Sequence, residues 1–422
     1  MTSVARALRR DLNLLDAVGI GVGAIVGAGI FVVTGVAAGI AGPGLLAGLV
    51  LAGVAAICNA LSSAELAAAY PASGGTYEYG YRVLTPAWGF TAGWMFLAGK
   101  TAAAGTVALG LGGYMETLVP GVPARFVAVA GAVGFTALNW FGVRRTSRLN
   151  LLVVALSVGA LVTFVLAGLP HLSAGHLRPF APYGWRGVLE GAALLFFAYT
   201  GYARIATLGE EVRDPTRVIP RAIILTIAGT LVLYAAVALV AVGSVGAPVL
   251  AASAAPLEAA ARSFDAAWAV PVVAVGGIAA MLGVMLSQLL GLSRMAFAMG
   301  RRGDLPTMLA HLHPRHEVPD RAIIVVGAIV TVVAATGTLR GVASAAAFTI
   351  LLYYGIANLA ALRMPRASKR YPDLVPIVGM VACAGLALSL NLRTVLLGLV
   401  VMAAGFVVRA AVRFIRRASR AA

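Results

Sequence analysis

Glycine is unusually dense inside the first long apolar segment of the chain. Five glycines fall between Gly19 and Gly29, although glycine weakens a helix interior more than any residue except proline. A broken membrane helix is tolerated only where the freed backbone groups line protein or water. Opened N–H and C=O groups at that depth suit a small solute that carries both charges, so they predict a binding site.

We expect the helix to break over residues 27–29 and a new half-helix to begin at residues 30–31. The first N–H groups of that half-helix would bind a carboxylate, and the carbonyl of Ile25 would accept a hydrogen bond from an ammonium group. Helix packing is the alternative, because Gly19, Gly23 and Gly27 recur every four residues and form a face of small residues. We assign packing to Gly19 and Gly23 and binding to residues 27–29.

A second break is expected in the aromatic stretch 196–202, where Gly201 is the only glycine. A lone glycine is a weak breaker, but this one lies in the matching segment of the second half of the chain. The ring of Phe197 would lie against an ammonium group, which is worth ~0.5–2 kcal/mol, or would belong to a packing cluster. We interpret Tyr353 and Tyr354 as packing or interface aromatics.

Lys100 lies near the middle of an apolar segment that spans residues 87–115. A charged lysine there costs at least ~2.5–3.5 kcal/mol, and ionisable residues inside membrane segments usually serve a function. Three roles are open: carrying a proton, holding an acidic substrate side chain, or bonding backbone carbonyls at a helix break. We favour the proton, because desolvation makes a lysine release its proton more easily.

Other polar residues give weaker signals. Gln288, beside Ser287, would add a polar contact to the binding site or join two helices by a hydrogen bond. The loop acids would pair with arginines in one conformation and release them in another, or form weak surface pairs, which is the default expectation; they are Glu65, Glu210, Glu211, Asp214 and Asp304. Three histidines resemble a metal spacing but are interpreted as solvated; they are His311, His313 and His316. The two cysteines lie far apart, so neither a disulfide nor a zinc site is predicted, and no cofactor or metal is expected.

The elements that must position these residues are twelve apolar segments, each near or above the ~20 residues that cross a bilayer as a helix. They are 14–41, 44–69, 87–115, 124–142, 149–169, 187–208, 220–243, 268–299, 321–338, 343–362, 373–390 and 394–413. Hydrophobic residues make up 61% of the chain and the mean hydropathy is +0.94, which excludes a soluble fold. The sequence therefore predicts an all-α membrane protein embedded in a lipid bilayer.

The net charge of +17 is distributed as orientation charge rather than as a face for nucleic acid. Of the 32 lysines and arginines, 25 lie before the first segment, in or at the edges of the connections that follow even-numbered segments, or in the tail. Six lie in or at the edges of the opposite loops, and Lys100 lies near the middle of a segment. This asymmetry predicts an even number of spans with both termini in the cytoplasm.

The twelve segments divide into five, five and two. Because five is odd, a second repeat of five spans would be inverted relative to the first, with a broken helix at the start of each. The predicted parts are a cytoplasmic N-terminus (1–13), a first repeat (14–169), a second repeat (187–362), a final pair of helices (373–413) and a cytoplasmic C-terminus (414–422).

Short motifs spread over most of the chain resemble the amino acid–polyamine–organocation transporters. They are Gly27-Ala28-Gly29-Ile30-Phe31, Leu61 to Leu66 with Tyr70-Pro71 and Gly74 to Tyr77, Gly89-Phe90 with Gly93-Trp94, Phe196 to Gly201, Glu210-Glu211 to Pro215, and Ser293-Arg294 to Pro306. The resemblance implies a LeuT-type fold, in which spans one to five and six to ten are inverted repeats with helices one and six broken. It also implies alternating access.

The resemblance further implies which residues bind substrate. The carboxylate would meet the backbone of the first break, the amino group would meet carbonyls at both breaks, and side chains of the third and eighth spans would line the pocket. The residues are Ile25, Gly27, Ala28, Gly29, Phe197, Ala198, Thr200 and Gln288, with Lys100 on the third span. The chain departs from proton-coupled members, which often have a lysine in the fifth span, because residues 149–169 contain none. Ala203 replaces an acid typical of cation carriers, which argues against arginine or polyamines.

We therefore expect a plasma-membrane amino acid transporter and not an enzyme, with protons as the coupled ion. An uncoupled exchanger and a transporter-like amino acid sensor are the alternatives. The sequence makes no prediction of the particular amino acid or of the oligomeric state.

Overall fold

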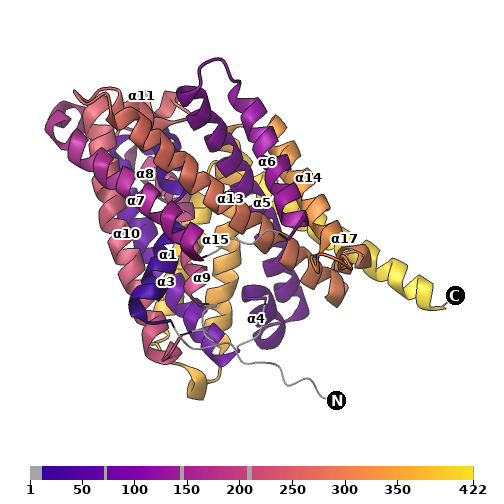
Figure 1. The fold of residues 1–422 in the computed structure, drawn as a ribbon. Helices are drawn as coiled ribbons and strands as arrows, with labels where there is room; N and C mark the ends of the chain where they lie inside the picture. The colour runs from indigo at the N-terminus through magenta and orange to yellow at the C-terminus, as the bar shows by residue number, and fades with distance from the viewer. Residues whose placement is uncertain (1–11, 71–73, 143–146, 207–211, 422) are drawn as a thin grey trace.

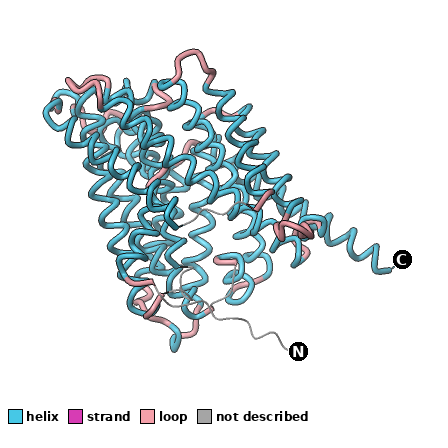
Figure 2. The backbone as a smooth tube through the Cα atoms, viewed as in Figure 1, coloured by secondary structure: helices cyan, strands magenta, loops and turns pink. Residues whose placement is uncertain are grey.

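The computed structural model describes residues 12–70, 74–142, 147–206 and 212–421. Within these ranges the chain is almost entirely helical, and the only pairing of extended backbone is an isolated bridge between Leu12 and Val212. Figures 1 and 2 show long helices side by side, joined by short loops, with the C-terminal helix extending out of the bundle. The predicted all-α class is confirmed.

Each of the twelve apolar segments coincides with one helix or with helices in line. In chain order the elements are α1 (Leu14–Ile25), η1 (Gly29–Val33), α2 (Thr34–Ala41), η2 (Gly42–Gly44), α3 (Leu45–Ala69), α4 (Thr76–Val83), α5 (Pro86–Leu118), α6 (Ala124–Trp140), α7 (Ser147–Gly168), η3 (Leu169–His171), η4 (Ala174–Leu177), α8 (Gly184–Tyr199), η5 (Thr200–Tyr202), α9 (Ala203–Ala206), α10 (Pro215–Val245), α11 (Ala247–Ala252), α12 (Pro256–Ala261), α13 (Ala269–Arg302), η6 (Thr307–Ala310), α14 (Asp320–Thr336), α15 (Leu339–Arg363), η7 (Arg366–Ser368), α16 (Leu374–Ser389) and α17 (Leu392–Ala421).

Seven helical stretches of the described residues are long and apolar enough to cross a membrane. They are Gly29–Ala69, Pro86–Leu118, Leu149–His171, Arg217–Val245, Ala269–Arg302, Leu339–Arg363 and Leu392–Arg416. Three shorter apolar helices, α1, α6 and α16, accompany them. The most apolar part of α15 is 72% buried and that of α17 only 22%, so α15 belongs to the centre of the bundle and α17 to its edge.

Small residues hold the central helices close together. Gly99 of α5 faces α15, and a Cβ atom on it would lie 2.7 Å from the hydroxyl of Thr349. Gly93 of α5 faces α13, where a Cβ atom would lie 2.9 Å from the sulfur of Met299. Close approach through glycine replaces the hydrophobic effect as a source of helix association in lipid. This packing places the segment around Lys100 between α13 and α15.

The two glycines assigned to packing differ in their surroundings. A Cβ atom on Gly23 would lie 2.4 Å from Val154 of α7, so the packing prediction is confirmed there. Gly19 is exposed, and a Cβ atom on it would meet no atom within 4 Å. The packing prediction is wrong at Gly19, because that face of α1 is turned away from its neighbours.

A buried ionic cluster ties α17 to the bundle. The carboxylate of Asp304, which is 1% exposed, follows α13 and accepts hydrogen bonds from the hydroxyls of Tyr77 (2.8 Å) and Tyr81 (2.5 Å) of α4. It also accepts from Nε of Arg409 at 2.9 Å, and Arg413 lies 3.5 Å away. The prediction of a weak surface pair is therefore wrong for Asp304, which lies in a closed site shared by three elements.

The remaining loop acids vary in environment. Glu65 is 2% exposed, and it accepts hydrogen bonds from the backbone of Arg370 and Tyr371, so the surface pair predicted for it is wrong as well. Asp214 lies 3.9 Å from Arg217 in an exposed pair, as predicted. The other two, Glu210 and Glu211, lie outside the described residues.

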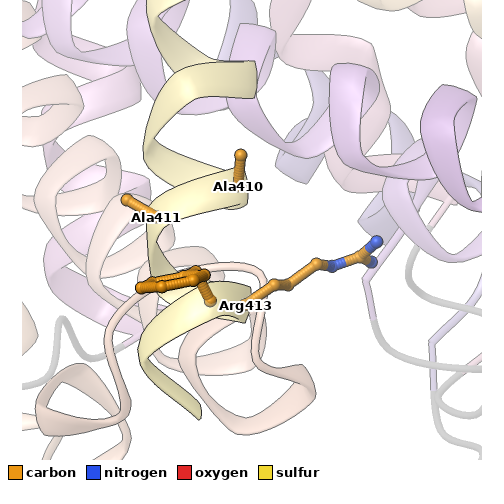
Figure 3. Close-up of a pocket in the computed structure, with 4 residues that line it drawn as sticks. Ala410, Ala411 and Arg413 are labelled. Carbon is orange, nitrogen blue, oxygen red and sulfur yellow. The ribbon is translucent and has the colours of Figure 1, made fainter. Parts of the chain in front are cut away.

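A hollow of about 540 Å³ lies on the surface of α17, lined by Ala410, Ala411, Arg413 and Phe414 (Figure 3). Figure 3 shows the side chain of Arg413 extending away from the axis of α17. All four residues come from one helix. The hollow is therefore a feature of the helix surface and not a site enclosed by the bundle.

Asp304→Asn is expected to lower the thermal stability of the protein. Removing one charge of a buried pair leaves the other uncompensated and costs about 3–5 kcal/mol. The melting temperature of the purified protein in detergent, monitored by a fluorescence assay that does not depend on thiols, measures the change in stability. Asp265→Asn is the matched control, because the carboxylate of Asp265 is fully exposed beside His171. Equal melting temperatures for the two variants would contradict the role of the cluster.

Candidate functional site

The first helix breaks where the glycines predict. α1 ends at Ile25, and Val26 is extended, with φ −69° and ψ 110°. After Gly27 and Ala28 the chain resumes at Gly29 as a short π-helix that leads into α2. The carbonyl of Gly27 accepts hydrogen bonds from the next turn, from the N–H groups of residues 30 and 31 at 3.2 and 3.3 Å.

Three backbone donors remain at this break. The N–H groups of Gly27, Ala28 and Gly29 have no backbone acceptor among the residues that the structure describes. All three residues are buried. They lie at the N-terminal end of the half-helix, where the backbone dipoles favour a negative charge. The arrangement is suited to a carboxylate.

Tyrosines bind two carbonyls at or just after the first break. The hydroxyl of Tyr234 of α10 donates to the carbonyl of Ile25 at 3.0 Å, and that of Tyr114 of α5 donates to Phe31 at 2.7 Å. Both tyrosines are fully buried. Sequence reasoning missed them, because a single tyrosine in an apolar segment has the same pattern as a packing residue.

The second break lies at residues 200–202, as predicted. α8 ends at Tyr199, and the 3-10 turn η5 connects it to α9. The hydroxyl of Thr200 donates to the carbonyl of Phe197 at 2.9 Å. The carbonyl of Thr200 in turn accepts from the hydroxyl of Tyr354 of α15 at 3.4 Å. Tyr354 was interpreted as a packing aromatic, and the structure adds this polar contact.

Glycine brings the two breaks into contact. A Cβ atom on Gly29 would lie 2.3 Å from the Cα atom of Ala198, and one on Gly201 would lie 2.1 Å from the carbonyl oxygen of Ala24. Real side chains do not tolerate such distances. Gly27 likewise faces Val284 of α13 at 2.7 Å. The glycines at 27 and 29 thus have a packing role in addition to opening the backbone.

Phe196 and Phe197, which are neighbours at the second break, differ in their ring contacts. Phe196 packs edge-on against Tyr354, with ring centroids 5.8 Å apart, and Tyr354 also lies 5.3 Å from Tyr202. No ring contact involves Phe197 within the described part of the chain, and it is 7% exposed. The packing cluster is therefore built on Phe196, and the ring of Phe197 is outside it.

Lys100 and Gln288 lie on facing sides of α5 and α13. The two helices run antiparallel, with Gly93 against Met299 and Gly110 against Met281. Lys100 lies seven residues, or two helical turns, after Gly93 and is therefore on the face of α5 that contains Gly93. Gln288 lies seven residues after Met281 and is on the corresponding face of α13. They are therefore within about one turn of each other along the interface.

Within the described part of the chain, Lys100 and the Oε1 atom of Gln288 have no hydrogen-bond partner. Lys100 is half-buried and forms no hydrogen bond or ion pair with any described residue. The Oε1 atom of Gln288 is buried and has no hydrogen-bond partner in the structure. Val284, which touches the first break, lies one turn before Gln288 on α13. Helical register along α5 and α13 thus indicates that Gln288 lies toward the break and Lys100 toward Gln288.

The three histidines are not simply solvated. His311 lies 2.7 Å from Asp320, and the rings of His313 and His316 pack beside Trp140, with centroids 5.2 and 5.3 Å from it. All three are half-buried. Among the described residues no group of three potential ligands could hold a metal ion. The histidines join the loop after α13 to the end of α6.

Known proteins are similar in sequence to this chain along nearly its whole length. A profile of the amino acid permease family matches residues 16–415. A transporter of Mycobacterium bovis described as uncharacterized is 46% identical over 98% of this chain and 93% of that protein. A branched-chain amino acid permease of Bacillus subtilis is 29% identical over 96% of this chain and 94% of that protein. A methylthioribose transporter of the same organism is 32% identical over 92% and 88%.

These relatives are transporters and not enzymes, and the resemblance noted in the motifs agrees with them. The apolar helices agree with a protein that crosses the membrane several times. The chain belongs to the amino acid permease family of the amino acid–polyamine–organocation superfamily.

Proposed function

We propose that the protein is a secondary active transporter that takes amino acids up across the plasma membrane by alternating access. The observation that carries the proposal is the set of three backbone N–H groups, at Gly27, Ala28 and Gly29, that have no backbone acceptor among the described residues. They lie at the contact between two interrupted helices. Paired interruptions of this kind bind solutes in many transporters.

In the proposed architecture all twelve apolar segments cross the membrane, with both termini in the cytoplasm. Segments one to five (14–169) and six to ten (187–362) form inverted repeats of the LeuT type, and two helices (373–413) follow. The interruptions at residues 26–28 and 200–202 support this division, because each falls in the first helix of its group of five.

This topology predicts that positions 176 and 315 lie on opposite sides of the membrane. Single cysteines introduced as His176→Cys and Arg315→Cys, after replacement of Cys58 and Cys383 by alanine, test it in intact cells. An impermeant maleimide is expected to label position 176 at once and position 315 only after permeabilisation. The cysteine-free protein is the control. Labelling of both positions from outside would contradict the topology.

In the bound state the substrate carboxylate would accept hydrogen bonds from Ala28 and Gly29. The amino group would lie toward the carbonyls of Ile25, Phe197 and Thr200, with the ring of Phe197 beside it. Gln288 would add a polar contact, and Ala198 would form part of the wall of the binding pocket. Burial of these groups supports the assignment, since hydrogen bonds to a charged carboxylate gain strength away from water.

Lys100 is proposed as the proton carrier. The lack of a protein partner for its ammonium group supports a residue that gains and loses its charge during the cycle. One observation favours the alternative of uncoupled exchange: the expected lysine is missing from residues 149–169. Purified protein in liposomes distinguishes the two. Counterflow requires transport, and accumulation driven by a pH gradient requires coupling; binding without either would indicate a sensor.

A further inference from the structure

The first break offers donors, and three carbonyls at or just after it already have donors of their own. The carbonyl of Ile25 accepts from Tyr234, and the carbonyl of Phe31 accepts from Tyr114. The carbonyl of Gly27 accepts from the next turn. The N–H groups of Gly27 to Gly29 have no backbone acceptor among the described residues. The break therefore presents three N–H groups to a carboxylate, and the carbonyl of Ile25 needs no donor from the ligand.

The second break repeats the pattern. The carbonyl of Phe197 accepts from the hydroxyl of Thr200, and the carbonyl of Thr200 accepts from Tyr354. These are the carbonyls, together with that of Ile25, that a substrate ammonium group would use. The protein thus supplies its own donor to each acceptor that the amino group would satisfy.

The hydroxyl of Tyr234 changes the binding free energy expected for a ligand that has no amino group. A buried carbonyl left without a donor costs about 1–3 kcal/mol. If Ile25 depended on the substrate for its donor, a ligand lacking the ammonium group would incur that cost. Because Tyr234 already donates to Ile25, the cost is removed, and the carboxylate interactions at residues 27–29 remain.

We propose that the central site also binds 2-oxo acids, the deaminated counterparts of amino acids, and that Tyr234 is the positioning residue that makes the amino group dispensable. The inference rests on the proposed function, because it uses the same carboxylate site. An amino acid would bind by sharing the carbonyl of Ile25, which has two lone pairs, between Tyr234 and its ammonium group.

Four matched pairs of ligands test the proposal on purified protein: alanine and pyruvate, valine and 2-oxoisovalerate, phenylalanine and phenylpyruvate, and glutamate and 2-oxoglutarate. Thermal shift and equilibrium dialysis give the dissociation constant of each. For the pair that binds best, the 2-oxo acid is expected to bind within about tenfold of the amino acid. This corresponds to a difference of no more than ~1.4 kcal/mol.

Tyr234→Phe should raise the ratio of the two dissociation constants, oxo acid over amino acid, by about tenfold, because Ile25 must then take its donor from the ligand. Tyr199→Phe is the matched control. The ring of Tyr199 lies 5.5 Å from that of Tyr234, but its hydroxyl bonds to Leu49, away from the break. Its ratio should stay at the wild-type value. Tyr354→Phe should act in the same direction as Tyr234→Phe and serves if that variant does not fold.

Each outcome decides the proposal. For the pair that binds best, a 2-oxo acid that binds more than about tenfold more weakly than its amino acid would overturn it. Equal ratios in Tyr234→Phe, Tyr354→Phe and Tyr199→Phe would overturn the positioning role. Gly29→Leu should abolish binding of both members of a pair, and loss of only one would overturn the shared site. Binding of a 2-oxo acid with no bound or transported amino acid would refute the proposed function and leave the carboxylate site standing.

Discussion

Gly29→Leu is expected to abolish amino acid binding while the protein still inserts into the membrane. Even a Cβ atom at position 29 would lie 2.3 Å from the Cα atom of Ala198, and a leucine adds three more carbons. The two breaks must separate, which moves the amides of residues 27–29 away from the second break. Overpacking of this kind costs about 1–3 kcal/mol in ordinary cores, and here it acts on backbone at the site itself. We expect at least a ~100-fold loss of affinity.

Scintillation proximity binding of a radiolabelled amino acid measures the loss, and size-exclusion chromatography in detergent checks that the variant is folded. Gly19→Leu is the matched control, because Gly19 lies on the same helix but has no atom near its Cβ position. It should bind as the wild type does. Wild-type affinity in Gly29→Leu would rule out the backbone site.

The positions of the breaks could be predicted from the sequence, whereas their stabilisation could not. Glycine at 27, 29 and 201 marks each interruption to within a residue or two, because the effect of glycine on a helix is local. The tyrosines that bind the freed carbonyls are remote: Tyr114 lies 83 residues from Phe31. Tyr234 lies 209 residues from Ile25. Only the packing of α5, α10 and α15 around the breaks identifies them.

The distribution of charge predicts an orientation in the membrane, but it contains no information on which charged side chains are buried. Arg409 is one of the tail arginines that the sequence assigns to the cytoplasmic side, and nothing near it in the chain indicates a partner. In the structure it is 6% exposed and bonded to Asp304, which lies 105 residues earlier. A pair of this kind depends on where α17 crosses the end of α13. The sequence pattern contains no information on that crossing.

Lys100→Ala is expected to lose stimulation of uptake by a proton gradient and to retain exchange. The ammonium group has no partner among the described residues, so its charge is compensated by neither an acid nor a carbonyl there. A proton carrier must exist both with and without its charge, and no described partner of Lys100 holds it in the charged form. Uptake into liposomes with and without an inward pH gradient measures the effect, and melting of the variant shows whether it is folded.

Lys100→Arg separates the proton role from the two alternatives. Arginine keeps the positive charge but does not release its proton. A proton carrier should therefore fail in both Lys100→Ala and Lys100→Arg, with exchange preserved in each. If Lys100 instead holds an acidic substrate side chain, Lys100→Arg should keep affinity for aspartate or glutamate and Lys100→Ala should lose it. If Lys100 is structural, Lys100→Ala should melt early whatever the substrate or pH. Gradient-driven accumulation that survives unchanged in both variants would exclude Lys100 from coupling and favour uncoupled exchange.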